Sequence, residues 1–256
     1  NPWLEAIERQ KSAHPYHDWN ERITAECYRP NGMARILDGS GRIDRILNNY
    51  SRISFNFGPT LLSWLQGHDP EVYDAVLRAD REAAARFSGH GAALAQCFNH
   101  LIMPLANARD KRTQVVWGLR DFEHRFGRKP EGMWLPETAV DLQTLEIMAG
   151  LGIKFPILAP HQAAAVRPKG ETLWQELKGS GIDPGKPHAC PLPSGRTLAI
   201  YFYDGVIAHD VAFGGLLKDG ENFARRLLGG FSPAETADRL VHIATDGETY
   251  GHHSRF

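Results

Sequence analysis

The sequence predicts an α/β fold, either a (β/α) barrel that lacks at least one strand or an open doubly wound sheet. Short apolar runs that resemble buried parallel strands alternate with amphipathic helical segments along the chain. With 256 residues, 42% of them hydrophobic, the chain can bury a large core, so one domain is expected. Only six strand candidates are found, and a closed barrel normally needs more. Either fold places functional residues at the carboxyl ends of the strands.

The six strand candidates are mostly continuous apolar runs, as expected for strands covered on both faces. They lie at residues 53–57, 94–98, 132–135, 155–159, 198–203 and 240–245. Helices are predicted between them at residues 70–87, 110–126 and 138–151, with Asp69-Pro70 opening the first and Gly127 and Gly152 ending the other two. The Pro- and Gly-rich segment 167–196 is interpreted as a long excursion over the barrel mouth, where binding loops usually lie.

Composition excludes several classes of partner. The formal net charge is −1 and no dense Lys/Arg cluster is present, which argues against a nucleic-acid surface or an acidic membrane as the partner. No apolar run approaches the roughly 18 residues of a membrane span. The three cysteines are isolated and form no CxxC motif, so a disulfide framework and a zinc finger are not expected, and a cytoplasmic location fits best. No cofactor and no metal are expected.

Glu137 is the first candidate catalytic carboxylate. It follows the apolar run 132–135, in which Trp134 precedes Leu135, and Pro136 blocks continuation of the strand. This geometry suits a nucleophile presented at the floor of a pocket. The alternative is a residue in the first turn of the next helix, favoured only by the helix dipole.

Asp246 is the second candidate. It follows the run 240–245 and precedes Gly247, so a residue of an Asx turn is the simpler interpretation. Glu248, His252 and His253 follow within seven residues, however, and a neighbouring carboxylate raises the pKa of one member of such a cluster, as a general acid requires. A Zn or Mn site is the competing interpretation of these ligand types, although no HExxH motif supports it.

Several aromatic and histidine side chains are candidates for binding a sugar. Trp19, Trp134 and Tyr250 offer flat faces to sugar rings, and His100, His161 and His209 offer hydrogen bonds to hydroxyl groups. Each has a structural alternative in the core or in a loop. The segment YHDWNERI, residues 16–23, is interpreted either as a helix entry capped by Asp18 or Asn20, or as a loop that faces the substrate.

The runs GMWLPETAVDLQTLEIMAGLGIKF and ATDGETYGHH, with HDWNERI and FNFGPTLLSWL, resemble glycoside hydrolase family 57 over nearly the whole chain. This resemblance implies an incomplete (β/α)7 barrel and retaining enzymes of α-glucans, among them amylases, 4-α-glucanotransferases, branching enzymes and amylopullulanases. It implies that Glu137 is the nucleophile of the Trp-x-Pro-Glu motif. It also implies that Asp246 is the acid/base that opens the Asp-x-Glu-x-x-Gly-His motif, with Glu248 and His252 at matching places.

Two further stretches match the family, and one motif does not. Residues 96–104, which include His100, resemble its second region, and residues 203–213, which include His209, resemble the segment lining the pocket. The family's His-x-Gln-Pro-like first motif is not found, and the chain ends directly after the fourth. We therefore expect residues 1–256 to be a single catalytic barrel domain that lacks its first strand, and a fragment of a longer protein.

The predicted function is a retaining α-glucan hydrolase or transglycosylase that works by double displacement. Retention predicts that the two carboxyl groups lie about 5–5.5 Å apart. The substrate-binding residues expected are Trp19, His100, Trp134, His161, His209, Glu248, Tyr250 and His252. The expected partner is an α-glucan or oligosaccharide, and the oligomeric state is left open. Two alternatives remain, a metal-dependent carbohydrate enzyme such as a polysaccharide deacetylase and a non-catalytic sugar-binding relative.

Overall fold

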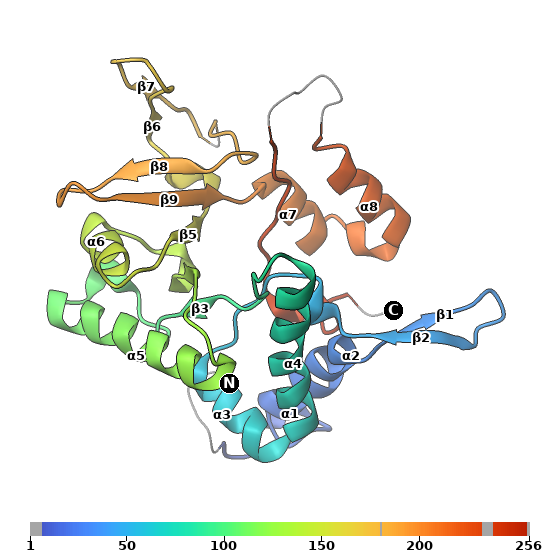
Figure 1. Ribbon diagram of the computed structural model, residues 1–256. Helices are drawn as coiled ribbons and strands as arrows, with labels where there is room; N and C mark the ends of the chain where they lie inside the picture. The colour runs from blue at the N-terminus through green and yellow to red at the C-terminus, as the bar shows by residue number, and fades with distance from the viewer. Residues whose placement is uncertain (1–6, 180, 232–237, 255–256) are drawn as a thin grey trace.

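A computed structural model describes residues 7–179, 181–231 and 238–254, and these residues form an α/β fold around a five-stranded sheet (Figure 1). The strand order is β3-β4-β5-β9-β8, with the first four strands parallel and β8 antiparallel at one edge. The strands are β3 (Ala95–Gln96), β4 (Gly132–Trp134), β5 (Phe155–Leu158), β8 (His188–Pro191) and β9 (Thr197–Phe202). A parallel bridge between Phe55 and Ala93 extends the sheet beside β3. The predicted α/β class is confirmed, and the open sheet fits an incomplete barrel.

The strand predictions are confirmed at four places. Residues 94–98, 132–135, 155–159 and 198–203 contain β3, β4, β5 and β9, whereas the strand predicted at 53–57 is reduced to the bridge at Phe55. The strand predicted at 240–245 is wrong. There the backbone makes isolated hydrogen bonds, from the Leu240 N–H to the Gly185 carbonyl (3.0 Å) and from the Asp204 N–H to the His242 carbonyl (2.9 Å), instead of a ladder.

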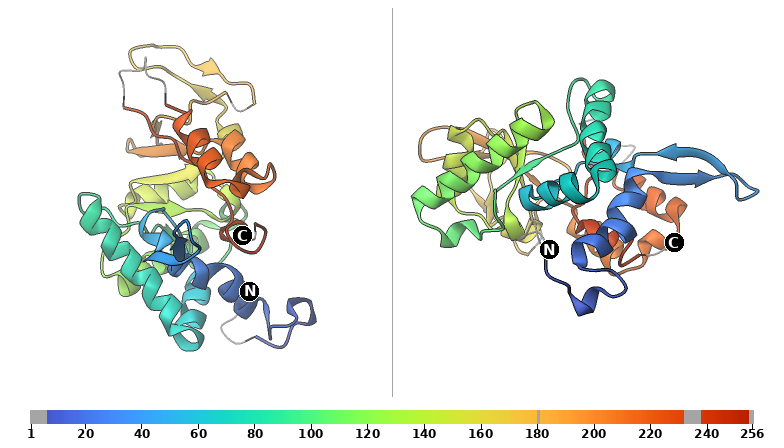
Figure 2. Two further views of the ribbon diagram at one scale, coloured as in Figure 1. Left: turned by 90° about the vertical axis from the view of Figure 1, so that its right-hand side faces the viewer. Right: turned by 90° about the horizontal axis from the view of Figure 1, so that it is seen from below.

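The predicted excursion at 167–196 is partly wrong, because it contains the edge strand β8. It also holds β7 (Gln175–Glu176), which pairs with β6 (Ala165–Val166) in a small antiparallel sheet. A second hairpin, β1 (Ala34–Leu37) with β2 (Ile43–Leu47), projects away from the body of the molecule (Figures 1 and 2).

The helices follow the capping signals in the sequence. Asp69 accepts a hydrogen bond from the Val72 N–H (3.2 Å), and Gly127, with a φ of 67°, ends the helix predicted at 110–126. The helix predicted at 138–151 begins only at Leu142, because Asp141 caps it by accepting from the Thr144 N–H (2.8 Å). The helices are α1 (Trp19–Ile23), α2 (Arg29–Gly32), α3 (Pro59–His68), α4 (Pro70–Arg86), α5 (Ala108–Phe126), α6 (Leu142–Gly150), α7 (Gly205–Ala212) and α8 (Gly220–Leu228).

The core lies between the sheet and the helices that cover it. Helix α5 contacts β3 and α6, and α6 contacts β9. Met133 and Leu135, at and after β4, and Met148 of α6 are almost completely buried there. At another part of the same core, the rings of Tyr28, Tyr50 and Phe57 meet edge to face with centroids 5.2 and 5.5 Å apart. These ring contacts fix the position of Tyr28 and of the turn at residues 24–28 that ends with it.

Asp80 and Arg128 form an ion pair that fixes α4 to the sheet. Asp80 is 2% exposed, and its carboxylate accepts from the Arg128 Nε (2.8 Å) and Nη2 (2.7 Å) and from the Ala93 N–H (2.8 Å). We expect Asp80→Ala to lower the free energy of unfolding by about 3–5 kcal/mol, because it leaves a guanidinium without its partner. Glu82→Ala removes an exposed pair with Arg78 in the same helix and is expected to cost less than about 1 kcal/mol. Urea unfolding of the two variants checks the difference, and equal costs would contradict it.

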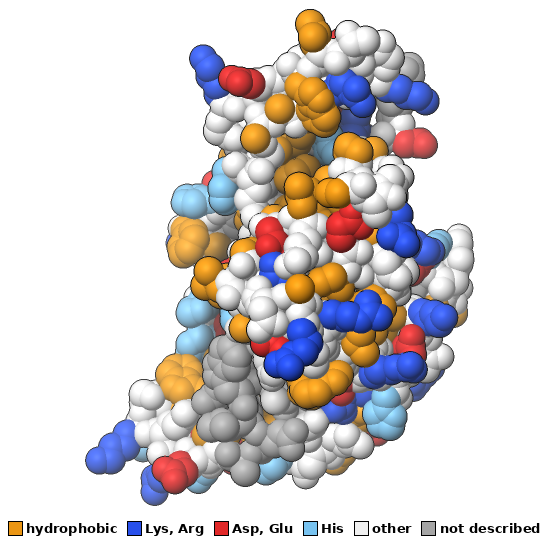
Figure 3. Space-filling view, turned by 90° about the vertical axis from the view of Figure 1, so that its left-hand side faces the viewer, with side chains coloured by type: hydrophobic (Ala, Val, Ile, Leu, Met, Phe, Trp, Pro, Cys, Tyr) orange, Lys and Arg blue, Asp and Glu red, His pale blue; other side chains and the backbone are white. Residues whose placement is uncertain are grey.

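The surface mixes charges and apolar groups. On the face shown in Figure 3, basic, acidic and hydrophobic side chains are interspersed. Among the described residues, no helix has both the length and the apolar character needed to cross a bilayer.

Candidate active site

Glu137 lies in the 3-10 turn η5 (Pro136–Thr138), directly after β4. Glu137 and Thr138 both have a φ of 55°, the left-handed conformation that side chains other than glycine rarely adopt. Such a conformation costs of order 1–3 kcal/mol and is held by the surrounding structure. Here the Thr138 N–H donates to the Leu135 carbonyl (2.9 Å), and Gln162 Nε2 donates to the Thr138 carbonyl (2.8 Å). The turn thus presents the Glu137 carboxylate away from the core.

His100 reaches Glu137 from the neighbouring strand. The two side chains are joined by a hydrogen bond of 3.0 Å between His100 Nε2 and Glu137 Oε1, and the Glu137 side chain is 68% exposed. His100 follows β3 and Glu137 follows β4, which are parallel neighbours. The carboxyl ends of these strands therefore bring together two residues that the sequence predicts for the site.

Asp246 precedes the 3-10 turn η8 (Gly247–Thr249). Asp246 is exposed, yet partial loss of hydration raises the pKa of its carboxyl group. The negative charges of Glu248 and then Glu137 raise this pKa further, whereas His253 lowers it. The charge of Glu137 acts on Asp246 although the two residues are far apart in the sequence. Glu137 therefore lies close enough to Asp246 for its charge to act on the Asp246 carboxyl group.

The residues after Asp246 contact the N-terminal part of the chain. The Tyr28 hydroxyl donates to Glu248 Oε1 (3.3 Å), and burial, followed by the charge of Glu248, holds the pKa of Tyr28 well above its usual value. His252 pairs with Glu26 through its Nδ1 and meets the ring of Trp19 edge to face at 5.6 Å. Two predicted site residues, Glu248 and His252, are therefore positioned by partners near the start of the chain.

Trp19, Glu248 and His252 line one pocket of about 530 Å³, together with Gln10, Asn20, Ile23, Tyr28, Leu61 and His253. The lining combines aromatic rings with carboxylate, imidazole and amide groups. One face of Trp19 is covered by the Arg22 guanidinium, 4.9 Å from the ring centroid. A pocket of this size and mixed chemistry suits a small polar ligand such as a sugar residue.

The other predicted site residues are spread around the strand ends. Trp134 is the half-buried last residue of β4, and the Tyr250 hydroxyl accepts from Thr245 Oγ1 (2.8 Å). His161 lies in the turn after β5, and His209 lies on α7 after β9, where its ring packs on Phe213 at 5.3 Å. In the described part of the chain neither histidine is hydrogen-bonded to Glu137 or Asp246.

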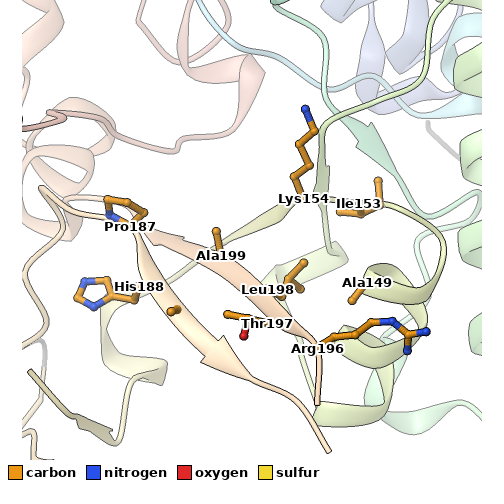
Figure 4. Close-up of a pocket in the computed structure, with 10 residues that line it drawn as sticks. Ala149, Ile153, Lys154, Pro187, His188, Arg196, Thr197, Leu198 and Ala199 are labelled. Atoms are coloured by element: carbon orange, nitrogen blue, oxygen red, sulfur yellow. The ribbon is translucent and has the colours of Figure 1, made fainter. Parts of the chain in front are cut away.

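A larger cavity of about 720 Å³ lies at the opposite end of the sheet (Figure 4). Ile153 and Lys154, just before β5, and Thr197, the first residue of β9, are among its lining residues. These positions are the amino ends of parallel strands, whereas Glu137 follows a carboxyl end. Among the described residues that line this cavity there is no carboxylate, the group that glycosidic cleavage needs.

Sequence reasoning missed several residues of the site. Gln10 and Tyr28 line the pocket, and Glu26 pairs with His252. Glu26 and Tyr28 lie just beyond the YHDWNERI segment, in a short π-helical turn, η2 (Thr24–Tyr28). Their partners are more than two hundred residues away in the sequence, and no local pattern reports such a contact.

The structure confirms the helix-entry interpretation of the YHDWNERI segment, and the substrate-facing interpretation stays a prediction. Asp18 caps α1 by accepting from the Glu21 N–H (3.1 Å), and Trp19 and Asn20 line the pocket. In the described residues, the only group of three possible metal ligands is His17, Asp18 and Glu21, whose ligand atoms lie within 4.8 Å of one another. The Asp18 carboxylate caps α1 and accepts a hydrogen bond from His17 Nδ1 (2.8 Å). These contacts account for the closeness of the three side chains without a metal ion.

A parallel sheet with Glu137 and His100 at the carboxyl ends of neighbouring strands is the arrangement that α/β-barrel enzymes use for their active sites. The chain belongs to glycosyl hydrolase family 57, which matches residues 12–256 and confirms the resemblance in the sequence. It is 25% identical to Alpha-amylase 1 of Dictyoglomus thermophilum over 122 residues, 48% of this chain and 17% of that protein.

Solved structures of other proteins share the fold. The 4-alpha-glucanotransferase of Thermococcus litoralis is 16% identical with a TM-score of 0.61, and the match covers 91% of this chain and 31% of that one. A GH57 branching enzyme of Thermococcus kodakaraensis is 15% identical with a TM-score of 0.61, and the match covers 96% of this chain and 63% of that one. The chain thus spans less than two thirds of the length of each of these relatives.

Proposed function

We propose that this protein cleaves or transfers α-glucosyl units of an α-glucan or oligosaccharide by double displacement with retention. The observation that supports this most is the raised pKa of Asp246, which loss of hydration raises first and the negative charges of Glu248 and then Glu137 raise further. A retaining reaction needs one ionised and one protonated carboxyl group in the same site. The names of the family relatives, an amylase, a glucanotransferase and a branching enzyme, support an α-glucan as the substrate class.

In the first step, the Glu137 carboxylate attacks the anomeric carbon, and the bond between that carbon and the leaving oxygen breaks. Asp246 gives its proton to this oxygen, so the departing chain leaves as an alcohol. In the second step, Asp246 takes a proton from water or from a sugar hydroxyl. The oxygen of that acceptor then bonds to the anomeric carbon, and the bond from this carbon to Glu137 breaks, which leaves Glu137 ionised and Asp246 protonated as at the start. Water gives hydrolysis and a sugar hydroxyl gives transfer.

The environment suits these two roles. Glu137 is exposed and hydrogen-bonded by His100, so it is accessible to the anomeric carbon. Asp246 has a raised pKa, which keeps its proton available at a higher pH than an ordinary aspartate allows. The pocket lined by Trp19, Glu248 and His252 is the proposed place for a glucose unit beside Asp246. We propose that Trp134, Tyr250, His161 and His209 contact further units.

We retain the cytoplasm as the expected compartment, consistent with three free cysteines.

Incubation of the full-length protein with maltoheptaose and amylose, with products separated by chromatography, tests this function. We expect shorter sugars from hydrolysis or longer and branched ones from transfer, and neither from Glu137→Ala. Binding of maltoheptaose without turnover would indicate a sugar-binding relative, and activity lost to a chelator would indicate a metal-dependent enzyme. Either outcome would overturn the proposal.

The Asp246 environment predicts a specific pH dependence. The first step needs protonated Asp246, so kcat/KM falls as the pH rises through the pKa of this residue. Glu248→Gln removes a negative charge that raises this pKa, so the alkaline limb should move to lower pH. His253→Gln removes a group that lowers it and should move the limb the other way. Profiles of kcat/KM against pH measure both shifts, and movement in the same direction would contradict the assignment.

A further inference from the structure

The turn that follows Asp246 is held by side chains from the N-terminal part of the chain. The Cys27 thiol shares its single proton between two acceptors, the Gly247 carbonyl (3.0 Å from Sγ) and the Tyr250 carbonyl (3.1 Å from Sγ). Asn31 Nδ2 donates to the same Tyr250 carbonyl (2.8 Å) and to the carbonyl of Cys27 (2.8 Å). Two side chains one helical turn apart therefore hold both ends of the turn from Gly247 to Tyr250.

The backbones also approach each other closely at this contact. Gly251 has a φ of 145°, and a Cβ at this position would lie 2.2 Å from the Glu26 carbonyl oxygen and 3.0 Å from the Cα of Cys27. Only glycine fits here, so the turn lies directly against the η2 helix. The Glu26 side chain adds its pairing with His252. Contacts on both sides of Tyr250 fix the turn against the N-terminal segment.

The two donors are themselves fixed. Cys27 is 1% exposed, and burial raises the pKa of its thiol to about 11, so it remains protonated and able to donate. Asn31 Oδ1 accepts from Asn49 Nδ2 (3.0 Å), which sets the orientation of its amide. Glu137 is held separately, through Gln162 and Thr138. The support of the two candidate carboxyl groups thus comes from different parts of the chain.

We propose that Cys27 and Asn31 are positioning residues for Asp246, and that they act by holding the Gly247 and Tyr250 carbonyl groups. This role rests on the proposed function. A general acid must lie within hydrogen-bond reach of the leaving oxygen, and a misplacement of about 1 Å costs on the order of 10²-fold in rate. Loss of these bonds frees the turn beside Asp246 and leaves the Glu137 turn intact. The acid-assisted step is therefore expected to suffer selectively.

The test compares a leaving group that needs a proton with one that does not. Cys27→Ala and Asn31→Ala of the full-length protein are assayed on maltoheptaose and on α-glucosyl fluoride. The first step determines kcat/KM, so we expect kcat/KM on maltoheptaose to fall about 10- to 100-fold and kcat/KM on the fluoride to fall less than about threefold. Cys27→Ser keeps a donor and should recover most of the loss. Cys190→Ala and Asn222→Ala are matched controls outside the contact.

Thermal unfolding of every variant accompanies the assays. If Asn31→Ala is unfolded at the assay temperature, the comparison of Cys27→Ser with Cys27→Ala decides the question alone. Equal losses of kcat/KM on both substrates, or no loss on either, would overturn the positioning role while the wild type and Glu137→Ala still support the proposed function. A wild type that turns over neither substrate would overturn the proposed function, and the positioning role with it.

Discussion

Glu137→Gly is expected to reduce turnover of maltoheptaose by about 10⁴-fold or more, because it removes the nucleophile of the first step. Glycine is the most informative substitution at this position, because it removes the carboxylate without straining the backbone. Residue 137 has a φ of 55°, which glycine adopts without steric cost, so the variant should unfold at the same temperature as the wild type or higher. Measurement of kcat together with the midpoint of thermal unfolding separates a catalytic loss from a folding defect.

Added azide distinguishes the role of Glu137 from that of Asp246. In Glu137→Gly, azide has room to attack the anomeric carbon of α-glucosyl fluoride directly, and the product should be β-glucosyl azide with the fluoride released. Activity that persists without azide would show that another group is the nucleophile. Gln162→Ala, which loses a bond to the Thr138 carbonyl and no carboxylate, is the neighbouring control and should retain far more activity.

Asp246→Ala is expected to reduce kcat on maltoheptaose by about 10²- to 10⁴-fold, the usual contribution of a general acid. The loss on α-glucosyl fluoride should be much smaller in the first step, because fluoride leaves without a proton. The alkaline limb of the pH profile should also disappear, since the group whose raised pKa sets it is absent. Steady-state kinetics on both substrates between acidic and alkaline pH measure these effects.

Azide should act differently on this variant. Glu137 still forms the glycosyl-enzyme intermediate in Asp246→Ala, and azide then attacks the intermediate without the help of a base, so the product should be α-glucosyl azide. A β-configured product would contradict the assignment of Asp246 as acid/base. Asp204→Ala removes the carboxylate that caps α7 and serves as a control for the loss of a different carboxylate.

The elements that could be predicted from the sequence have local causes. The apolar runs at 132–135 and 155–159 form strands whose residues are buried or half-buried, and Asp69 and Gly127 mark helix ends through bonds within their own helices. Pro136 correctly indicated the end of β4. It did not indicate the left-handed conformation of Glu137, which depends on Gln162 holding the next residue.

The failures have long-range causes. The run 240–245 is as apolar as a true strand, but its backbone bonds go singly to Gly185 and Asp204, and no local pattern specifies that choice. Likewise, the sequence marked Asp246 and its neighbours as a titratable cluster but could not show that Cys27 and Asn31 hold them, because the partners are about 220 residues apart. The residue types predicted which side chains could carry the chemistry. The side chains that hold them in place make tertiary contacts that the sequence does not reveal.

The stereochemistry of the reaction tests the central claim most directly, since double displacement by Glu137 and Asp246 requires retention. Proton NMR of the wild-type protein acting on maltoheptaose follows the anomeric signals before mutarotation mixes them. We predict that the first-formed reducing end, or the first new linkage in a transfer product, is α. A β-configured first product would mean that a single displacement takes place, and it would contradict the role of Glu137 as nucleophile.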